Sequence, residues 1–141
     1  MSTAPPFATL IPHAGAMVLL DEVVACDEQG IRCRTRSHRD PANPLARDGV
    51  LPIWAGIEYA AQAMAAHFAL QAGTQGAATS GLFGGLRDVY CAAGRLDDVD
   101  SSLIVTASRL SFDPAGSIYD FTVAAEASGR ELLRGRATVV Q

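Results

Sequence analysis

Polar and apolar residues alternate strictly along several stretches of this chain. In residues 31–38 small apolar side chains fall on one face, and three arginines and His38 fall on the other. Residues 118–127 and 131–140 alternate in the same way. A period of two residues is typical of a half-buried β-strand. Each stretch therefore predicts a strand with one buried face, and the shared parity predicts that His38 faces outward.

Three further apolar runs, residues 17–25, 82–92 and 102–112, also predict strands. Within the second run the pair Gly84-Gly85 indicates a bulge or a close approach of backbone. The sequence Asp-Pro-Ala-Gly at 113–116 is typical of a turn. The chain thus predicts two strands before residue 39 and three or four strands after residue 81.

Residues 53–71 follow a different period, because apolar residues recur there at the spacing of an α-helix. Pro52 suits the first turn of that helix, and its many small residues let a sheet approach closely. A helix that is apolar on nearly all sides has to be wrapped by other elements. We therefore predict one α+β domain over residues 1–141, with an antiparallel sheet around one long central helix.

Composition narrows the class of protein. Only 18% of the 141 residues are charged and 49% are hydrophobic, which favours a buried interface in a dimer or larger assembly. The net charge of −4 argues against binding to nucleic acid. The three cysteines lack the spacing of a zinc site or disulfide framework. With no signal-peptide pattern and no apolar run of about 18 residues, we expect a cytoplasmic protein without a membrane span.

Glu58 is an acid in the middle of the apolar helix, and it is the first candidate for chemistry. An ionised carboxylate is costly to bury unless it is paired or hydrogen-bonded, so a chain that keeps one in such a helix often uses it. Gln62 follows one helical turn later, on the same helix face. We expect the Gln62 amide to orient Glu58; the alternative is that it fills a polar hole at a dimer seam.

Two segments resemble a known family. Residues 10–23 read Leu-Ile-Pro-His-Ala-Gly-Ala-Met-Val-Leu-Leu-Asp-Glu-Val, and residues 51–63 read Leu-Pro-Ile-Trp-Ala-Gly-Ile-Glu-Tyr-Ala-Ala-Gln-Ala. They resemble the opening element and the central helix of hotdog-fold 3-hydroxyacyl-[acyl-carrier-protein] dehydratases. Among these, the chain is most similar to the divergent dehydratase-like subunits of aryl polyene biosynthesis clusters.

The resemblance implies a hotdog fold and the dehydration of 3-hydroxyacyl thioesters on acyl carrier protein to trans-2-enoyl thioesters, in a fatty-acid or polyene pathway. It also implies that Glu58 corresponds to the catalytic acid of the family. No metal or diffusible cofactor is implied, because the phosphopantetheine of the carrier protein brings the substrate. The chain departs from the family in two places: the loop at residues 43–49 lacks the family's histidine, and Ile53 stands where the family has glycine.

Of the three histidines, we take His13 as the candidate base, since it leads into the first strand. His38 shares the arginine face, and His67 lies nine residues after Glu58 on another helix face, which favours a structural role. Asp48 could act as an acid only if its loop folds inward. The remaining predicted substrate contacts are backbone amides near Ile53 and Trp54 as oxyanion donors, and Trp54, Tyr59 and Gln62 around the site.

Two rival functions remain open. The first is thioester hydrolysis on the same fold, with Glu58 activating water on acyl-CoA or acyl carrier protein. The second is a non-catalytic subunit that completes the site of a related hotdog partner, which the missing loop histidine favours. The chain would act as a homodimer or a heterodimer. A stripe formed by Arg32, Arg34, Arg36 and Arg39 is either a solvated face or a docking surface for an acidic carrier protein.

Overall fold

A computed structural model describes residues 7–9, 11, 15–72 and 82–140. Within these residues lie one long helix, six strands and three short 3₁₀ turns at Phe7–Thr9, Gly15–Met17 and Ser37–Arg39. The elements are β1 (Glu22–Cys26), β2 (Gly30–Thr35), α1 (Ala55–Ala72), β3 (Leu82–Cys91), β4 (Leu103–Asp113), β5 (Gly116–Ala125) and β6 (Glu131–Val140).

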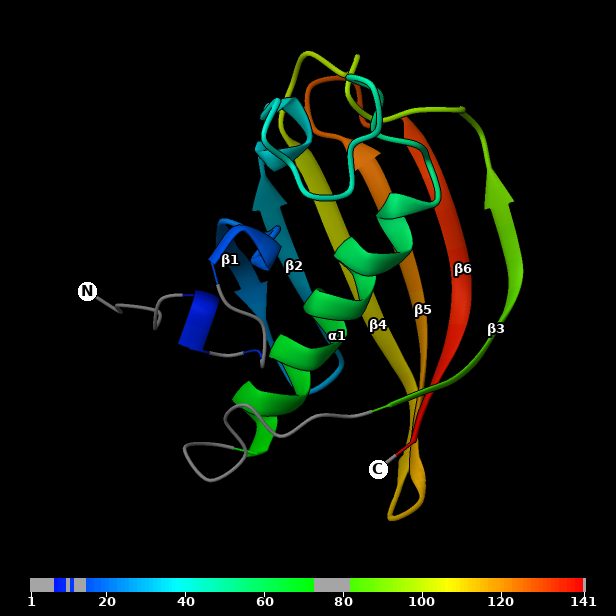
Figure 1. Ribbon diagram of the computed structural model, residues 1–141. Helices are drawn as coiled ribbons and strands as arrows, with labels where there is room; N and C mark the ends of the chain where they lie inside the picture. The colour runs from blue at the N-terminus through cyan, green and yellow to red at the C-terminus, as the bar shows by residue number, and fades with distance from the viewer. Residues whose placement is uncertain (1–6, 10, 12–14, 73–81, 141) are drawn as a thin grey trace.

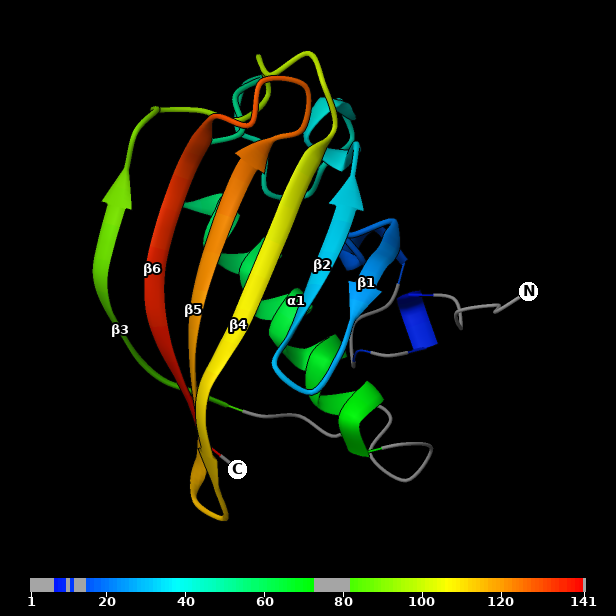
Figure 2. The same ribbon diagram turned by 180° about the vertical axis from the view of Figure 1, so that it is seen from behind.

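The six strands form one antiparallel sheet in the order β1-β2-β4-β5-β6-β3. The sheet curves around α1, which packs on its inner face against β2, β4 and β5 (Figure 1). No helix of the described residues lies on the opposite face (Figure 2). Strands β1 and β3 are the two edges. This arrangement confirms the predicted α+β hotdog architecture with a single central helix.

The side of α1 that meets the sheet is built from small residues. Ala55, Ala63 and Ala66 have no exposed surface. A Cβ atom added at Gly56 would lie 2.6 Å from Cδ2 of Leu133, so any larger residue there would force the Leu133 side chain to move. The prediction that small residues allow close helix–sheet packing is confirmed, and it places the start of α1 firmly over the sheet.

Strand alternation matches the prediction in the second half of the chain, where every second residue of β5 is buried. The first half differs. Residues 17–25 form a strand only from Glu22 onward, and β2 ends at Thr35 rather than at His38. The 3₁₀ turn that follows rotates His38 into the interior, where it is only 1% exposed. The prediction that His38 faces outward is therefore wrong, because the strand parity does not extend to it.

The edge strand β3 reaches past the area that α1 covers. Its register with β6 shifts between Phe83 and Gly85, which confirms the bulge expected at the paired glycines. Further along, Leu86 pairs with Ala137, whose side chain is buried on the helix side of the sheet. Paired residues share a face, yet Leu86 is 41% exposed. An apolar side chain thus lies uncovered on the inner face beside α1.

His67 is a buried structural histidine, as the sequence predicted. Its Nε2 lies 2.8 Å from the carbonyl oxygen of Asp27 and its Nδ1 lies 2.6 Å from the hydroxyl of Tyr119. A carbonyl can only accept, so Nε2 carries the proton and Nδ1 accepts from the tyrosine. The neutral ring is therefore fully satisfied. Burial lowers the pKa of His67, and it lowers the pKa of His38 as well.

We predict that the protein loses stability as the solution becomes acidic. A histidine whose folded pKa lies below its unfolded value of 6.5 contributes full stability above 6.5, and that contribution is lost as the pH falls toward the folded pKa. The free energy of unfolding, measured by urea denaturation, should fall between about pH 7 and about pH 5. The decline should be shallower in His67→Gln and His38→Gln. An unchanged slope in both variants would contradict this assignment.

Candidate active site

The start of α1 is held by a short ladder with the loop that follows β3. The Leu96 amide donates to the Leu51 carbonyl at 2.8 Å, and the Ile53 amide donates to the Gly94 carbonyl at 3.0 Å. Asp97 extends this ladder, because its Oδ1 accepts the Leu51 amide at 2.8 Å. These bonds fix the residues immediately before the helix, and so they fix where its first turn begins.

Asp97 is itself oriented by Arg95, whose Nε donates to Oδ1 at 3.0 Å. The Arg95 guanidinium holds the pKa of the Asp97 carboxyl at about 2, well below its usual range. Asp97 thus stays charged at neutral pH and remains a strong acceptor for the Leu51 amide. The Arg95–Asp97 ion pair therefore helps to fix the backbone at Leu51, just before α1 begins.

Tyr59 forms a second attachment, one residue after Glu58. Its side chain has no exposed surface, and its hydroxyl lies 2.7 Å from Oγ of Ser37 and 2.9 Å from Nδ2 of Asn43. Ser37 donates its own proton to the Leu19 carbonyl at 2.6 Å, so Tyr59 donates to Ser37 and accepts from Asn43. Burial raises the pKa of this hydroxyl, which keeps its proton. The network joins the helix to the loop before it.

Gln62 forms the third attachment. Its Oε1 accepts the Leu19 amide at 2.9 Å and its Nε2 donates to the Met17 carbonyl at 2.6 Å. The side chain is completely buried. The described hydrogen bonds of Gln62 therefore tie α1 to the chain before β1, which satisfies a backbone donor and acceptor that have no strand partner there. Orientation of Glu58 by Gln62 stays a prediction.

Glu58 lies half-buried in the first turn of α1, at the edge of an open pocket of about 340 Å³. The other lining residues are apolar: Met17, Leu45, Trp54, Ala55 and Ile57. Among the described lining residues, Glu58 supplies the ionisable side chain. The pocket therefore offers one carboxyl group beside a surface suited to an acyl chain.

The backbone amides at the helix start differ in whether they already donate a hydrogen bond within the fold. Ile53 donates to Gly94, and Ala55 and Gly56 donate to carbonyls three residues earlier. An N–H group has a single proton, so the Ile53 amide is engaged within the fold and is removed as an oxyanion donor in this conformation. No hydrogen bond to a described residue engages the Trp54 amide. Trp54 also lines the Glu58 pocket, and its side chain is 57% exposed.

The structure brings some of the predicted site residues together and separates others. Glu58 and Trp54 share the pocket, whereas Tyr59 and Gln62 lie beside it in the interior. Asp48 is exposed, with a φ angle of 52° in its loop, so it does not turn inward. His13 lies outside the described residues.

Sequence reasoning missed residues that line the Glu58 pocket or fix the segments beside it. Asn43, Leu45 and Asp97 were not singled out, and Asn43 was noted only as part of a loop without histidine. The one local signal was the Asn43-Pro44 pair, which is typical of a turn start. Nothing in the sequence could show that the Asn43 amide reaches a tyrosine sixteen positions later.

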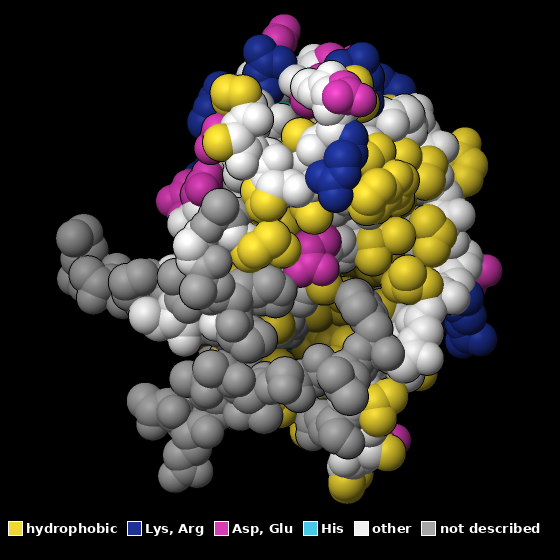
Figure 3. All heavy atoms as spheres, in the orientation of Figure 1, with side chains coloured by type: hydrophobic (Ala, Val, Ile, Leu, Met, Phe, Trp, Pro, Cys, Tyr) yellow, Lys and Arg dark blue, Asp and Glu magenta, His cyan; other side chains and the backbone are white. Residues whose placement is uncertain are grey.

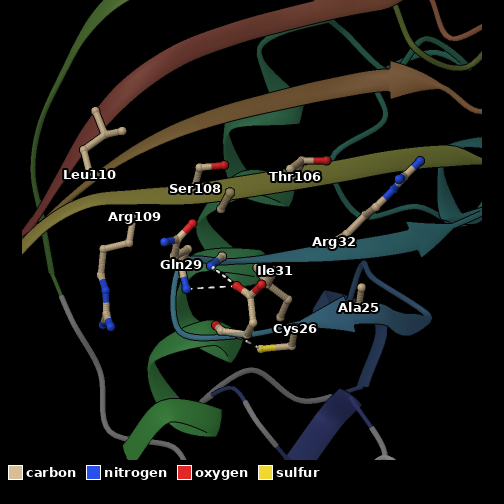
Figure 4. A pocket seen from close by; sticks show the side chains of 12 residues that line it. Ala25, Cys26, Gln29, Ile31, Arg32, Thr106, Ser108, Arg109 and Leu110 are labelled. Carbon is tan, nitrogen blue, oxygen red and sulfur yellow. Dashed lines mark hydrogen bonds between the residues drawn. The ribbon is translucent and has the colours of Figure 1, made fainter.

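A second hollow of about 400 Å³ lies on the face of the sheet away from α1, over β1, β2 and β4 (Figure 4). Arg32 and Arg109 belong to its lining, but their side chains extend in different directions and do not converge on a common point (Figure 4). Arg109 reaches the Glu28 carbonyl at 3.2 Å and stacks over Phe112. Of the predicted catalytic and substrate-binding residues that the structure describes, none is among the residues that line this hollow.

The arginines of the predicted stripe contact different parts of the protein. Arg34 forms ion pairs with Glu22 at 2.7 Å and with Glu126 at 2.6 Å. Arg39 donates to the Asp97 carbonyl oxygen at 2.7 Å. The positive charge of Arg34 is therefore balanced by Glu22 and Glu126 on the surface of the sheet.

An antiparallel sheet curled around one helix defines a hotdog-fold protein, and here an acid in the first helical turn lies beside an apolar pocket. A family model described as "ApeP-like: ApeP dehydratase" matches residues 5–141. The chain belongs to this ApeP-like dehydratase family.

Solved structures agree with this assignment. The dehydratase heterocomplex ApeI:P from Xenorhabdus doucetiae aligns with a TM-score of 0.85 and 26% identity, covering 99% of this chain and 92% of that one. AziG of S. sahachiroi aligns with a TM-score of 0.65 at 14% identity, covering 89% and 91% of the two chains. The PaaI protein of the E. coli phenylacetic acid degradation operon aligns with a TM-score of 0.60 at 13% identity, covering 85% of this chain and 82% of that one. The last two show the shared fold.

Among curated proteins, the sequence finds no significant match. Within the part of the chain that the structure describes, no helix is both long and apolar enough to cross a bilayer.

We predict that Asp97→Ala destabilises the protein by about 1–3 kcal/mol, because it leaves the buried Leu51 amide without an acceptor. Asp97→Asn keeps an acceptor oxygen and should cost less. Asp98→Ala is the matched control, since Asp98 is 63% exposed and lies 4.0 Å from Arg95; it should change stability by no more than about 0.5 kcal/mol. Urea unfolding measures all three, and equal losses in Asp97→Ala and Asp98→Ala would contradict the role given to Asp97.

Proposed function

We propose that this protein is a subunit of a 3-hydroxyacyl-[acyl-carrier-protein] dehydratase that acts in aryl polyene biosynthesis and works with a related hotdog subunit. The observation that carries the proposal is the position of Glu58, half-buried at an apolar pocket in a chain of the ApeP-like dehydratase family. The substrate arrives on the phosphopantetheine arm of acyl carrier protein. The reaction then needs no further cofactor.

In this proposal Glu58 acts as the general acid. Removal of a proton from C-2 of the acyl chain and protonation of the C-3 hydroxyl by Glu58 release water and leave the trans-2-enoyl thioester. A carboxyl group next to apolar walls is suited to this role, because few waters compete for its proton. The apolar side chains around Glu58 would hold the acyl chain with its C-3 hydroxyl toward the acid.

His13 is the proposed base: after each turnover it would give the proton from C-2 to solvent, and Glu58 would take a proton back from solvent. The proposed oxyanion donor is the Trp54 amide, because it lies at the N-terminal end of α1, lines the pocket and has no hydrogen-bond partner among the described residues. A backbone donor at a helix start favours the negative charge that develops on the thioester oxygen.

A second candidate function rests on the loop at residues 43–49, which holds no histidine. In that case the chain would support the active site of its hotdog partner and carry no turnover of its own. The similar solved structure ApeI:P is a dehydratase heterocomplex, and this supports pairing with a second subunit. A thioesterase on the same fold remains a third possible outcome of the assay below.

We predict that Glu58→Gln lowers the rate of dehydration by about 100-fold or more, because general acid catalysis typically contributes that much. Mass spectrometry of a 3-hydroxyacyl carrier protein, incubated with the chain alone and with a related hotdog subunit, measures the loss of water. Asp48→Asn is the matched control, since Asp48 is an exposed acid in the preceding loop. It should leave the rate unchanged.

The outcomes separate the three functions. Water loss that is abolished by both Glu58→Gln and His13→Ala supports the dehydratase. Release of the free acid instead identifies a thioesterase. Turnover that needs the partner and is insensitive to both substitutions identifies a supporting subunit, and it would overturn the catalytic role proposed for Glu58.

The proposed hotdog partner would cover the inner face beside α1. Hydrophobic side chains gather on that side over β5 and β6, toward β3 (Figure 3). Leu86 and Val89 of β3 are 41% and 40% exposed there, and a Cβ atom on Gly135 would touch Val89. An exposed apolar area beside an unpaired strand edge is typical of a protein–protein contact.

We predict that Leu86→Asp weakens association with the hotdog partner by at least about tenfold, because it buries an unpaired charge in the contact. Val24→Asp is the control: Val24 is 42% exposed, but it lies on β1, the opposite edge of the sheet. Light scattering and titration of the purified subunits measure the effect. Equal weakening by both variants would place the contact elsewhere.

A further inference from the structure

We propose that Leu45 is a specificity-determining residue that excludes acyl groups with a branch at C-2, and that Asn43 is the positioning residue that holds Leu45 in place. This inference rests on the proposed function, since it concerns the acyl group that reacts beside Glu58. It concerns the loop in which the family's histidine is missing.

Leu45 and Glu58 line the same pocket of about 340 Å³. An acyl group bound in this pocket would therefore meet both the Glu58 carboxyl and the Leu45 side chain. The Leu45 side chain is half-buried and packs against the hydrophobic core. It therefore presents an anchored wall to the pocket, and a wall of this kind discriminates between ligands by their bulk.

Asn43 fixes the loop that carries this wall. Its Oδ1 accepts the Leu45 amide at 2.9 Å, and its Nδ2 donates to the carbonyl of Ser37 and to the hydroxyl of Tyr59, each at 2.9 Å. An asparagine that bonds to the amide two residues later sets the turn of its own loop. The Asn43 side chain is 7% exposed, so these bonds are shielded from water.

The same amide links the loop to the helix turn that bears the acid. Tyr59 is the direct neighbour of Glu58 in α1, and its hydroxyl accepts from the Asn43 amide. The position of Leu45 relative to Glu58 is thus set by one buried side chain that touches both segments. Loss of Asn43 would release Leu45 while leaving every pocket-lining side chain chemically intact.

The bulk that matters lies at C-2 and C-3, the carbons that react next to Glu58. A fixed leucine beside them would admit an unbranched 3-hydroxyacyl group and obstruct the same group with a methyl at C-2. One methyl group at a packed site changes selectivity by about 10-fold to 200-fold. Shortening Leu45 should open the space for that methyl and reduce the discrimination.

Binding can be measured on the full chain without turnover, because Trp54 is its single tryptophan and lines the pocket. The probes are amide analogues of 3-hydroxyacyl pantetheine, one unbranched and one with a methyl at C-2, titrated against the fluorescence of Trp54. We predict that the unbranched analogue binds at least about tenfold tighter, and that Leu45→Ala reduces this ratio by about tenfold. Asn43→Ala should reduce it in the same direction, and the double variant should reduce it no further than Leu45→Ala.

Leu110→Ala is the control, since Leu110 is an exposed leucine of β4 outside the Glu58 pocket; it should leave the ratio unchanged. Leu45→Val tests the wall with a smaller change if Leu45→Ala does not fold. A ratio that stays at the wild-type value in the Leu45 variants overturns the specificity role. Equal weakening of both analogues in Asn43→Ala overturns the positioning role.

Binding of neither analogue by the wild type also overturns the inference, because the pocket would then not hold an acyl group. Selective binding without any loss of water in the carrier-protein assay would refute the proposed dehydratase activity. The ratio of the two affinities would still report on Leu45. The failure of one proposal is therefore distinguishable from the failure of the other.

Discussion

The hydrogen bonds that hold the first turn of α1 determine the geometry of everything around Glu58. The hydrophobic effect is not directional, so close packing on the sheet is supplemented by contacts that do have a direction. Three such attachments are present: Leu51 and Ile53 bond to the loop after β3, Tyr59 bonds to the loop before the helix, and Gln62 bonds to the chain before β1. Glu58 lies between the first attachment and the other two.

These attachments also explain why polar side chains are tolerated in the core. Tyr59 and Gln62 have no exposed surface, and burial of an unpaired amide or hydroxyl is costly. Both find partners mainly in irregular backbone and loop side chains, groups that no strand or helix satisfies. Each of these hydrogen bonds therefore satisfies both a buried side chain and a partner group that would otherwise lack a bond. Together they fix the relative position of three segments that are far apart in the sequence.

Much of the fold could be predicted from the sequence, because periodicity reports burial directly. The helix at residues 53–71 and the alternation of β5 and β6 were predicted with nearly the correct bounds. His38 was placed on the wrong side because a 3₁₀ turn interrupts the parity after Thr35, and turns of that kind leave little trace in the sequence. Local patterns describe an element well but do not show where it ends.

The site was less predictable, since its geometry depends on contacts between distant residues. The spacing of Glu58 and Gln62 correctly places both on one side of the helix, but it could not show that Gln62 would bond to Met17 and Leu19, more than forty positions away. Likewise, the missing histidine was visible in the loop, whereas the use of Asn43 to fix that loop was not. Helical spacing gives the direction of a side chain but not the backbone that meets it.

Charged side chains form ion pairs on the outer face of the sheet. Arg34 pairs with Glu126 and Arg136 pairs with Asp120. Exposed pairs of this kind add little stability, but they keep that face polar and solvated. On the inner face beyond α1, Leu86 is 41% exposed, so the two faces of one sheet differ in what they can meet. Water suits the outer face, whereas a second apolar surface suits the inner one, beside the pocket that holds Glu58.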